Sequence, residues 1–189
     1  MLQPKLLIKV LTLLNESQID YMVTGSIVSS IQGEPRATHD VDILVNITTA
    51  AIPALIKAFT PPDYYISESA IEEAIRHKSM FNLLDTTEGD KADFWILTNE
   101  PFDQSRFARK YEEKVLGFSM KISTPEDTIL MKLRWSKLSG GSEKQFTDAL
   151  RVYEVQFLNL DLNYMEAWSQ TLQIKEFWER LKKEAQPII

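Results

Sequence analysis

Two aspartates at the head of an apolar strand are the feature that most restricts the fold of this chain. Asp40 and Asp42 stand two residues apart, and the apolar run 43–45 follows them directly. Because side chains alternate along a strand, both carboxylates share one face, with their Cα atoms roughly 7 Å apart. Acidic residues are disfavoured inside strands. We therefore interpret the pair as ligands for hard divalent cations, with a solvent-facing acidic pair as the alternative.

Gly25 and Ser26 are predicted to form a strand-to-helix turn upstream of the aspartates. The strand-like segment 21–24 precedes them, and residues 27–31 can begin a helix. Such a turn presents backbone N–H groups and a hydroxyl at a helix N-terminus, which suits phosphate. The alternative is a helix cap and a turn glycine without a ligand. Together with the aspartates, the turn predicts chemistry on a nucleoside triphosphate.

Asp93 is the candidate for a third carboxylate. It opens the apolar segment 94–97, as Asp42 opens its own strand. If the two strands pair, three carboxylates converge and can bridge two divalent cations roughly 4 Å apart. That arrangement stabilises the attacking and leaving oxygens in phosphoryl transfer. The alternative is an ordinary turn acid, and Asp90 competes for the same role.

The residues just before the aspartate pair are further candidates. Arg36 and Thr38 are predicted to orient phosphate or to hold the aspartate loop. For Arg36, an ordinary surface charge is the alternative. His39 should alternate away from Asp40 and Asp42 along the strand, so we assign it no catalytic role.

Composition narrows the kinds of site that the chain can build. It has 189 residues, a net charge of −6, no cysteine and two histidines. Disulfides and Cys-zinc sites are therefore excluded, and any metal must be held by oxygen, which suits Mg²⁺ or Mn²⁺. The negative charge argues against indiscriminate nucleic-acid binding. No apolar run approaches the roughly 20 residues of a membrane span, and the start lacks a signal-peptide pattern, so we expect a cytoplasmic protein.

The order of periodic segments predicts an α/β (α+β) fold with a mixed sheet flanked by helices. We expect strands at 21–24, 41–46, 64–66, 80–84 and 92–97, a hairpin over 113–122, and helices at 5–15, 27–33, 50–59, 71–76 and 101–109. The predicted secondary structure changes at Thr124 from mixed strands and helices to helices alone. A hydroxyl N-cap, a proline at the first helical position and acids in the first turn begin a helix there. We therefore predict an α/β core over 1–122 and a helical region over 123–189, packed as one unit.

Lys132 and Asp148 lie on the predicted C-terminal helices. Lys132 stands next to the core-facing Leu133. Lys144, Asp148 and Arg151 share one helical face, so an exposed ladder of ion pairs is the simplest interpretation of the spacing.

Taken together, these residues resemble the signature of the DNA polymerase beta superfamily of nucleotidyltransferases. That signature is a Gly-Ser on a strand-to-helix turn, a later Asp-x-Asp, and a third acid on a neighbouring strand, matched by Gly25-Ser26, Asp40-Val41-Asp42 and Asp93. Within the superfamily, segment 36–42 is similar to the Arg-x-Thr-x-Asp-hydrophobic-Asp motif of the AbiEii-type group, which includes toxins of toxin–antitoxin pairs. Those relatives also carry a Pro-Glu-Asp helix start with a downstream lysine, and an aspartate on the next helix. Here these match 125–127, Lys132 and Asp148, so the resemblance covers roughly residues 20–155.

The resemblance implies a metal-dependent transfer of a nucleoside monophosphate from a nucleoside triphosphate to an acceptor hydroxyl or phosphate, with release of pyrophosphate. Asp40 and Asp42 would hold both Mg²⁺ or Mn²⁺ ions, and Asp93 would complete the acceptor-side site and assist deprotonation. Gly25 and Ser26 would bind the triphosphate. Lys132 becomes a possible triphosphate or acceptor contact, and Asp148 becomes a candidate site residue.

The acceptor stays open between tRNA, a protein and a small molecule, and an antitoxin or a second copy of the chain is a possible partner. The alternative function is a catalytically inactive nucleotide-binding or partner-binding module of the same fold, for example in a toxin–antitoxin pair.

Overall fold

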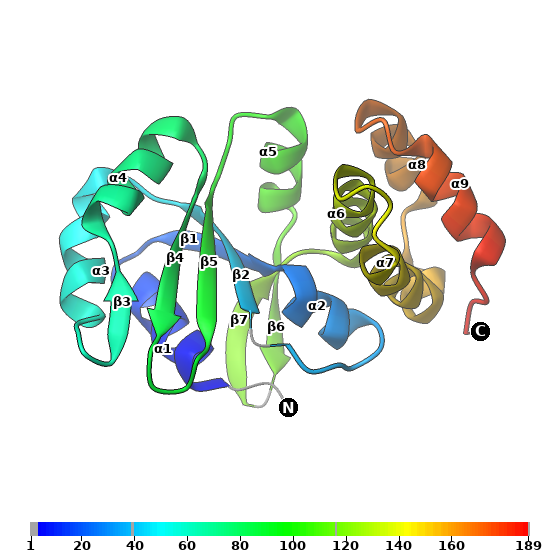
Figure 1. Cartoon of the computed structure of the whole chain (residues 1–189). Helices are drawn as coiled ribbons and strands as arrows, with labels where there is room; N and C mark the ends of the chain where they lie inside the picture. The colour runs from blue at the N-terminus through cyan, green and yellow to red at the C-terminus, as the bar shows by residue number, and fades with distance from the viewer. Residues whose placement is uncertain (1–3, 39, 116, 189) are drawn as a thin grey trace. The chain divides into compact units, whose positions relative to one another are not determined.

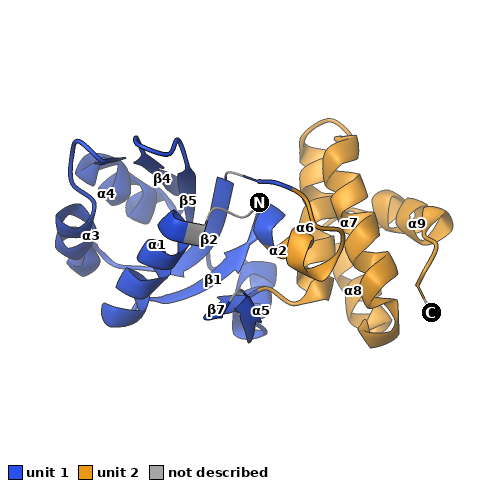
Figure 2. Cartoon of the chain, turned by 90° about the horizontal axis from the view of Figure 1, so that it is seen from below, with its two compact units in different colours: residues 1–27, 37–122 blue, residues 28–36, 123–189 orange. Residues whose placement is uncertain are grey.

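The computed structural model describes residues 4–38, 40–115 and 117–188, which form two compact units. Unit 1 consists of residues 1–27 and 37–122, and unit 2 of residues 28–36 and 123–189 (Figure 2). Segment 28–36 thus groups in space with the C-terminal helices, although it precedes most of the strands in the sequence. His39, to which we assigned no role, lies outside the described residues.

Unit 1 is built on a seven-stranded mixed sheet, as far as the described residues show (Figure 1). The strand order is β3-β4-β5-β2-β1-β7-β6, in which the pairs β2/β5 and β1/β7 are parallel and the others antiparallel. The strands are β1 Asp20–Thr24, β2 Asp40–Asn46, β3 Tyr64–Ile66, β4 Met80–Asp85, β5 Lys91–Ile96, β6 Tyr111–Val115 and β7 Phe118–Ile122.

The first helix of unit 1 buries an apolar stripe. In α1 (Pro4–Glu16), the side chains at 6, 7, 10, 11 and 14 are at most 1% exposed. Unit 1 also contains α3 (Ile52–Ala58), α4 (Glu68–His77) and α5 (Pro101–Ala108). Phe107 of α5 packs with Met22 of β1 and Leu44 of β2 in a buried cluster, against which Trp95 is partly buried. This packing anchors the central strands whose ends carry the candidate acids.

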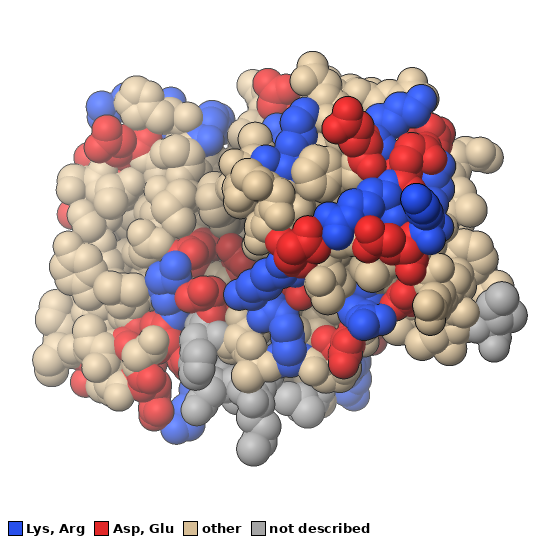
Figure 3. All heavy atoms as spheres, turned by 45° about the vertical axis from the view of Figure 1, so that its right-hand side comes forward, with Lys and Arg blue, Asp and Glu red and all other residues tan. Residues whose placement is uncertain are grey.

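The C-terminal helices of unit 2 begin at the predicted cap. The Thr124 side chain accepts a hydrogen bond from the backbone N–H of Asp127, and Pro125 opens α6 (Pro125–Leu138). The next helices are α7 (Glu143–Gln156), α8 (Leu162–Thr171) and α9 (Lys175–Glu184), with residues of α2 (Gly25–Gln32) from 28 onward also in this unit. On the face drawn in Figure 3, basic side chains lie among acidic ones, so this face does not present a single sign of charge.

The α/β fold class predicted from the sequence is confirmed. Strands fall where the alternating patterns placed them, and after Thr124 the described secondary structure is helical. Among the described residues, no helix combines the length and apolar character needed to span a bilayer.

Candidate active site

The parallel pairing of β2 with β5 brings the candidate acids of unit 1 together. Asp42 lies directly opposite Asp93 in the register, and Asp40 lies opposite Lys91. Neighbouring strands are about 4.8 Å apart, and partners in register project to the same side of the sheet. The strand pairing on which the three-carboxylate hypothesis depends is therefore present. Asp90 precedes β5, so Asp93 is the acid in register with the pair.

The turn at Gly25 lies against Asp42. Gly25 follows β1 directly, where Thr24 pairs with Asp42, and its φ is +71°. A Cβ atom at this position would overlap the Asp42 carboxylate, with only 2.7 Å to Cγ and 2.8 Å to Cβ. Glycine is required here both for the left-handed backbone and for space. As predicted, α2 begins at this turn, so Ser26 lies in its first turn.

Three side chains that the sequence analysis did not single out hold the acids in place. The ammonium of Lys91 lies 2.8 Å from Oδ2 of Asp93 and 3.7 Å from Oδ1 of Asp40. The side-chain amide of Asn82 on β4 donates to Oδ1 of Asp93. The indole N–H of Trp95 donates to Oδ1 of Asp42 at 3.2 Å. Lys91 and Trp95 stand two residues either side of Asp93, a spacing that could have identified both from the sequence.

The acids and Lys91 are strongly coupled electrostatically. The hydrogen bond to Asp93 raises the pKa of Lys91 above its ordinary value, against the opposing effect of partial burial, and the charges of Asp93, Asp40 and Asp42 add to the increase. Asp93 is 8% exposed, whereas the Asp40 side chain is 61% exposed. The cluster therefore runs from a buried acid to one at the surface.

The carboxylates of the three aspartates are chemically suited to bind a divalent cation. Carboxylate oxygens are the ligands that Mg²⁺ and Mn²⁺ take, and Gly25 leaves room beside the Asp42 carboxylate that a Cβ would fill. Within the described residues, however, no three His, Cys, Asp or Glu side chains are already arranged to hold a metal ion. The ammonium of Lys91 lies between two of the three acids instead.

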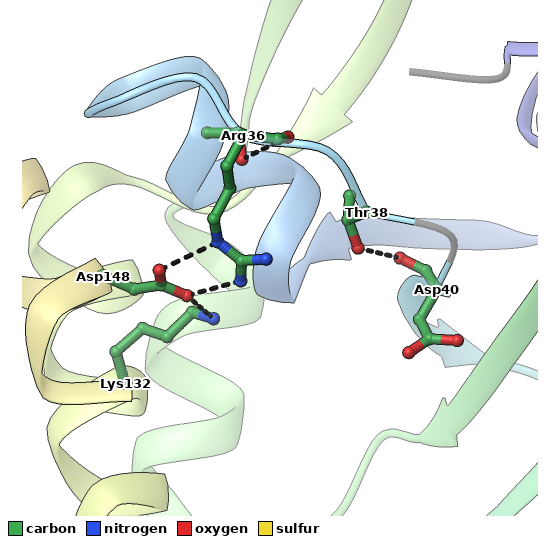
Figure 4. Close-up of polar contacts among 6 residues, drawn as sticks. Arg36, Thr38, Asp40, Lys132 and Asp148 are labelled. Atoms are coloured by element: carbon green, nitrogen blue, oxygen red, sulfur yellow. Dashed lines mark hydrogen bonds and ion pairs between the residues drawn. The ribbon is translucent and has the colours of Figure 1, made fainter. Parts of the chain in front are cut away.

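In unit 2, Asp148 is the centre of a buried ionic network (Figure 4). Its carboxylate accepts from Nε and Nη2 of Arg36 at 3.0 and 2.8 Å, and from Nζ of Lys132 at 2.7 Å. Lys132 is 4% exposed. Burial alone would raise the pKa of Asp148, but the hydrogen bonds and charges of Arg36 and Lys132 outweigh it and hold that pKa below its ordinary value.

This network corrects two interpretations that the spacing left open. Asp148 is not part of an exposed ladder, because its carboxylate is largely buried and bonded to Arg36 and Lys132. Arg151 instead pairs with Glu34 and Glu154. Arg36 is likewise not an ordinary surface charge.

Thr38 contacts the backbone at the start of the aspartate pair. In unit 1, its hydroxyl donates to the backbone carbonyl of Asp40 at 3.4 Å (Figure 4). The contact ties the loop to the first residue of β2.

No protein-family model matches the chain, and no curated protein matches its sequence significantly. Solved structures do resemble it. An antigenic nucleotidyltransferase-like protein from Paracoccidioides brasiliensis is 18% identical with a TM-score of 0.54, covering 97% of this chain and 94% of its own. The lincosamide antibiotic adenylyltransferase LnuA, bound to lincomycin, is 15% identical with a TM-score of 0.54, covering 80% and 96% respectively. The antibiotic-resistance factor ANT(2'')-Ia is 11% identical with a TM-score of 0.58, covering 96% and 95%. The chain therefore has the nucleotidyltransferase fold.

Proposed function

We propose that this protein is a nucleotidyltransferase, which moves a nucleoside monophosphate from a nucleoside triphosphate to an acceptor and releases pyrophosphate. The observation that carries the proposal is the register of β2 with β5, which sets Asp42 beside Asp93 while the Gly25 turn lies against Asp42. The fold shared with proteins described as nucleotidyltransferases supports it.

In this proposal the three aspartates bind the metal ions, and Asp93 also activates the acceptor hydroxyl. Asp40, Asp42 and Asp93 would hold Mg²⁺ or Mn²⁺, which when bound supplies positive charge to the phosphate oxygens. A carboxylate oxygen of Asp93 would receive the proton of the acceptor hydroxyl as its oxygen forms the new bond to the α-phosphorus. The bond from that phosphorus to the bridging oxygen breaks, and pyrophosphate leaves with the electron pair.

The other candidate residues would bind the charged substrate. The N–H groups of the first turn of α2 and the Ser26 hydroxyl would receive the triphosphate. We assign Arg36, Lys132 and Asp148 to binding the triphosphate or the acceptor, because a guanidinium and an ammonium held by one carboxylate are groups that bind phosphate. Asp148 would then fix the direction in which the Lys132 ammonium points.

The test is transfer of label from nucleotide to acceptor. Purified protein is incubated with Mg²⁺, each α-labelled triphosphate in turn, and cell extract, and the labelled acceptor is identified as tRNA, protein or small molecule. Asp42→Asn should abolish transfer. Asp20→Asn is the matched control, because Asp20 also opens a strand of the sheet and is ion-paired to Lys110 and Lys121.

Both variants must keep the circular dichroism and thermal unfolding of the wild-type protein for the comparison to count. Transfer that persists in Asp42→Asn would reject the proposed site, and so would an equal loss of transfer in Asp42→Asn and Asp20→Asn.

A second candidate is a module that binds nucleotide or a partner without turnover, for example in a toxin–antitoxin pair. The Lys91 ammonium favours it, because it already balances part of the acidic charge without a metal. This function predicts that a fluorescent triphosphate binds while no pyrophosphate is released with any acceptor. Detection of pyrophosphate in the wild-type reaction, and its absence with Asp42→Asn, decides for the enzyme.

A further inference from the structure

Lys91 has a place in the acidic cluster that strand pairing alone does not require. It opens β5 opposite Asp40 and projects to the same face as Asp93. Its ammonium is 2.8 Å from one acid and 3.7 Å from the other. The ammonium therefore lies among the same oxygens to which the proposed function assigns the cation.

An ammonium is chemically suited to this position. It is a compact point charge with three donors, and it neutralises one of the three negative charges on this face. The Lys91 side chain is 34% exposed and sits on a flexible four-carbon stem, so it can swing to solvent without moving the backbone. A divalent cation competing for the Asp93 oxygen has to replace it.

We propose that Lys91 is a built-in counter-ion of the aspartates, and that a divalent cation binds by displacing its ammonium from Asp93 and Asp40. The inference rests on the proposed function for the identity of the cation site. It makes Lys91 a positioning residue that keeps the acids together in the metal-free protein and weakens their affinity for metal alone.

The test measures Mn²⁺ binding in the absence of nucleotide, from the loss of the electron paramagnetic resonance signal of free Mn²⁺. Lys91→Gln should bind Mn²⁺ about tenfold more tightly than the wild-type protein, because the competing charge is gone. Lys91→Arg keeps the charge and should restore an affinity close to wild type. In EDTA, Lys91→Gln should unfold at a lower temperature than wild type, and Mn²⁺ should restore the loss.

Lys121→Gln is the matched control. Lys121 also lies on a strand of the sheet, pairs with an aspartate at 2.9 Å, and has a side chain that is 35% exposed. Lys121→Gln removes one positive charge from the protein, as Lys91→Gln does. Any general electrostatic gain in Mn²⁺ affinity should therefore appear in both of these variants. The gain specific to Lys91→Gln should disappear when Asp42→Asn is added.

The results separate this inference from the proposed function. Mn²⁺ affinity that is unchanged or weaker in Lys91→Gln, or equally increased in Lys121→Gln, overturns the counter-ion role even if the wild-type protein transfers nucleotide. A specific increase supports the role even if no transfer is found, in which case it is the proposed function that fails.

Discussion

Replacing Asp148 with asparagine should strongly destabilise unit 2 while changing almost nothing in shape. The substitution removes one negative charge from a carboxylate that accepts hydrogen bonds from Arg36 and Lys132. Removing one partner of a buried ion pair costs about 3–5 kcal/mol, because the remaining charge has lost its compensation in a poorly solvated place.

The exposed fractions of the three side chains refine this estimate of the energy. The side chains of Asp148 and Lys132 are 9% and 5% exposed. Breaking their interaction should therefore cost as much as breaking a buried pair. The Arg36 side chain is 29% exposed. Solvent therefore screens much of the effect of losing its ion pair with Asp148. The asparagine oxygen can still accept one hydrogen bond. We therefore expect the free energy of unfolding to fall by about 2–4 kcal/mol.

Urea unfolding followed by tryptophan fluorescence measures the effect. Trp135, Trp168 and Trp178 all lie in unit 2 and report on it. With a slope of about 2 kcal/mol per molar urea, the midpoint should shift down by about 1–2 M. The double variant with Lys132→Met should be less destabilised than the sum of the single variants by at least about 1 kcal/mol.

Glu143→Gln is the control on the same helix. Glu143 pairs with Arg180 through two hydrogen bonds of 2.8 and 3.0 Å, but its side chain is 68% exposed. The urea unfolding midpoint of Glu143→Gln should match that of wild type, because exposed ion pairs contribute little to stability. A shift for Asp148→Asn no larger than that of Glu143→Gln, or additive effects with Lys132→Met, would refute the reasoning from burial.

Two further predictions concern pH and the turn. Because the pKa of Asp148 is lowered in the folded protein, its contribution is fully present above the unfolded pKa of about 3.9 and is lost as pH falls through the lower folded value. The stability difference between wild type and Asp148→Asn, measured by urea unfolding at several pH values, should be constant above about pH 5 and shrink below about pH 4; a constant difference down to pH 3 contradicts the assignment. Gly25→Ala should cost more stability than the roughly 1–2 kcal/mol of a left-handed alanine, because its Cβ also collides with Asp42. Gly89→Ala isolates the backbone cost, since Gly89 has a φ of +77° and nothing within 4 Å of the added atom; equal melting temperatures for the two variants would argue against the collision.

The local part of this structure is readable from the sequence. Alternation along a strand is enough to place Asp40 and Asp42 on one face, and the chemistry of Thr124 and Pro125 is enough to begin α6. The same alternation sets Lys91 on the face of Asp93, two residues away, and this spacing is enough to identify it as a neighbour of the acid. These features depend on neighbours within a few residues, and backbone geometry determines them.

Only the tertiary structure decided which of these local features meet. β5 could have paired elsewhere in the sheet, and its register beside β2 is what sets Asp93 opposite Asp42 and the Lys91 ammonium between two acids. Asp148 has a spacing typical of an exposed ladder, yet its partner Arg36 is 112 residues away in the sequence. Burial and charge pairing at such separations follow from how the whole chain packs, because the free energy of each contact depends on partners that no local pattern specifies.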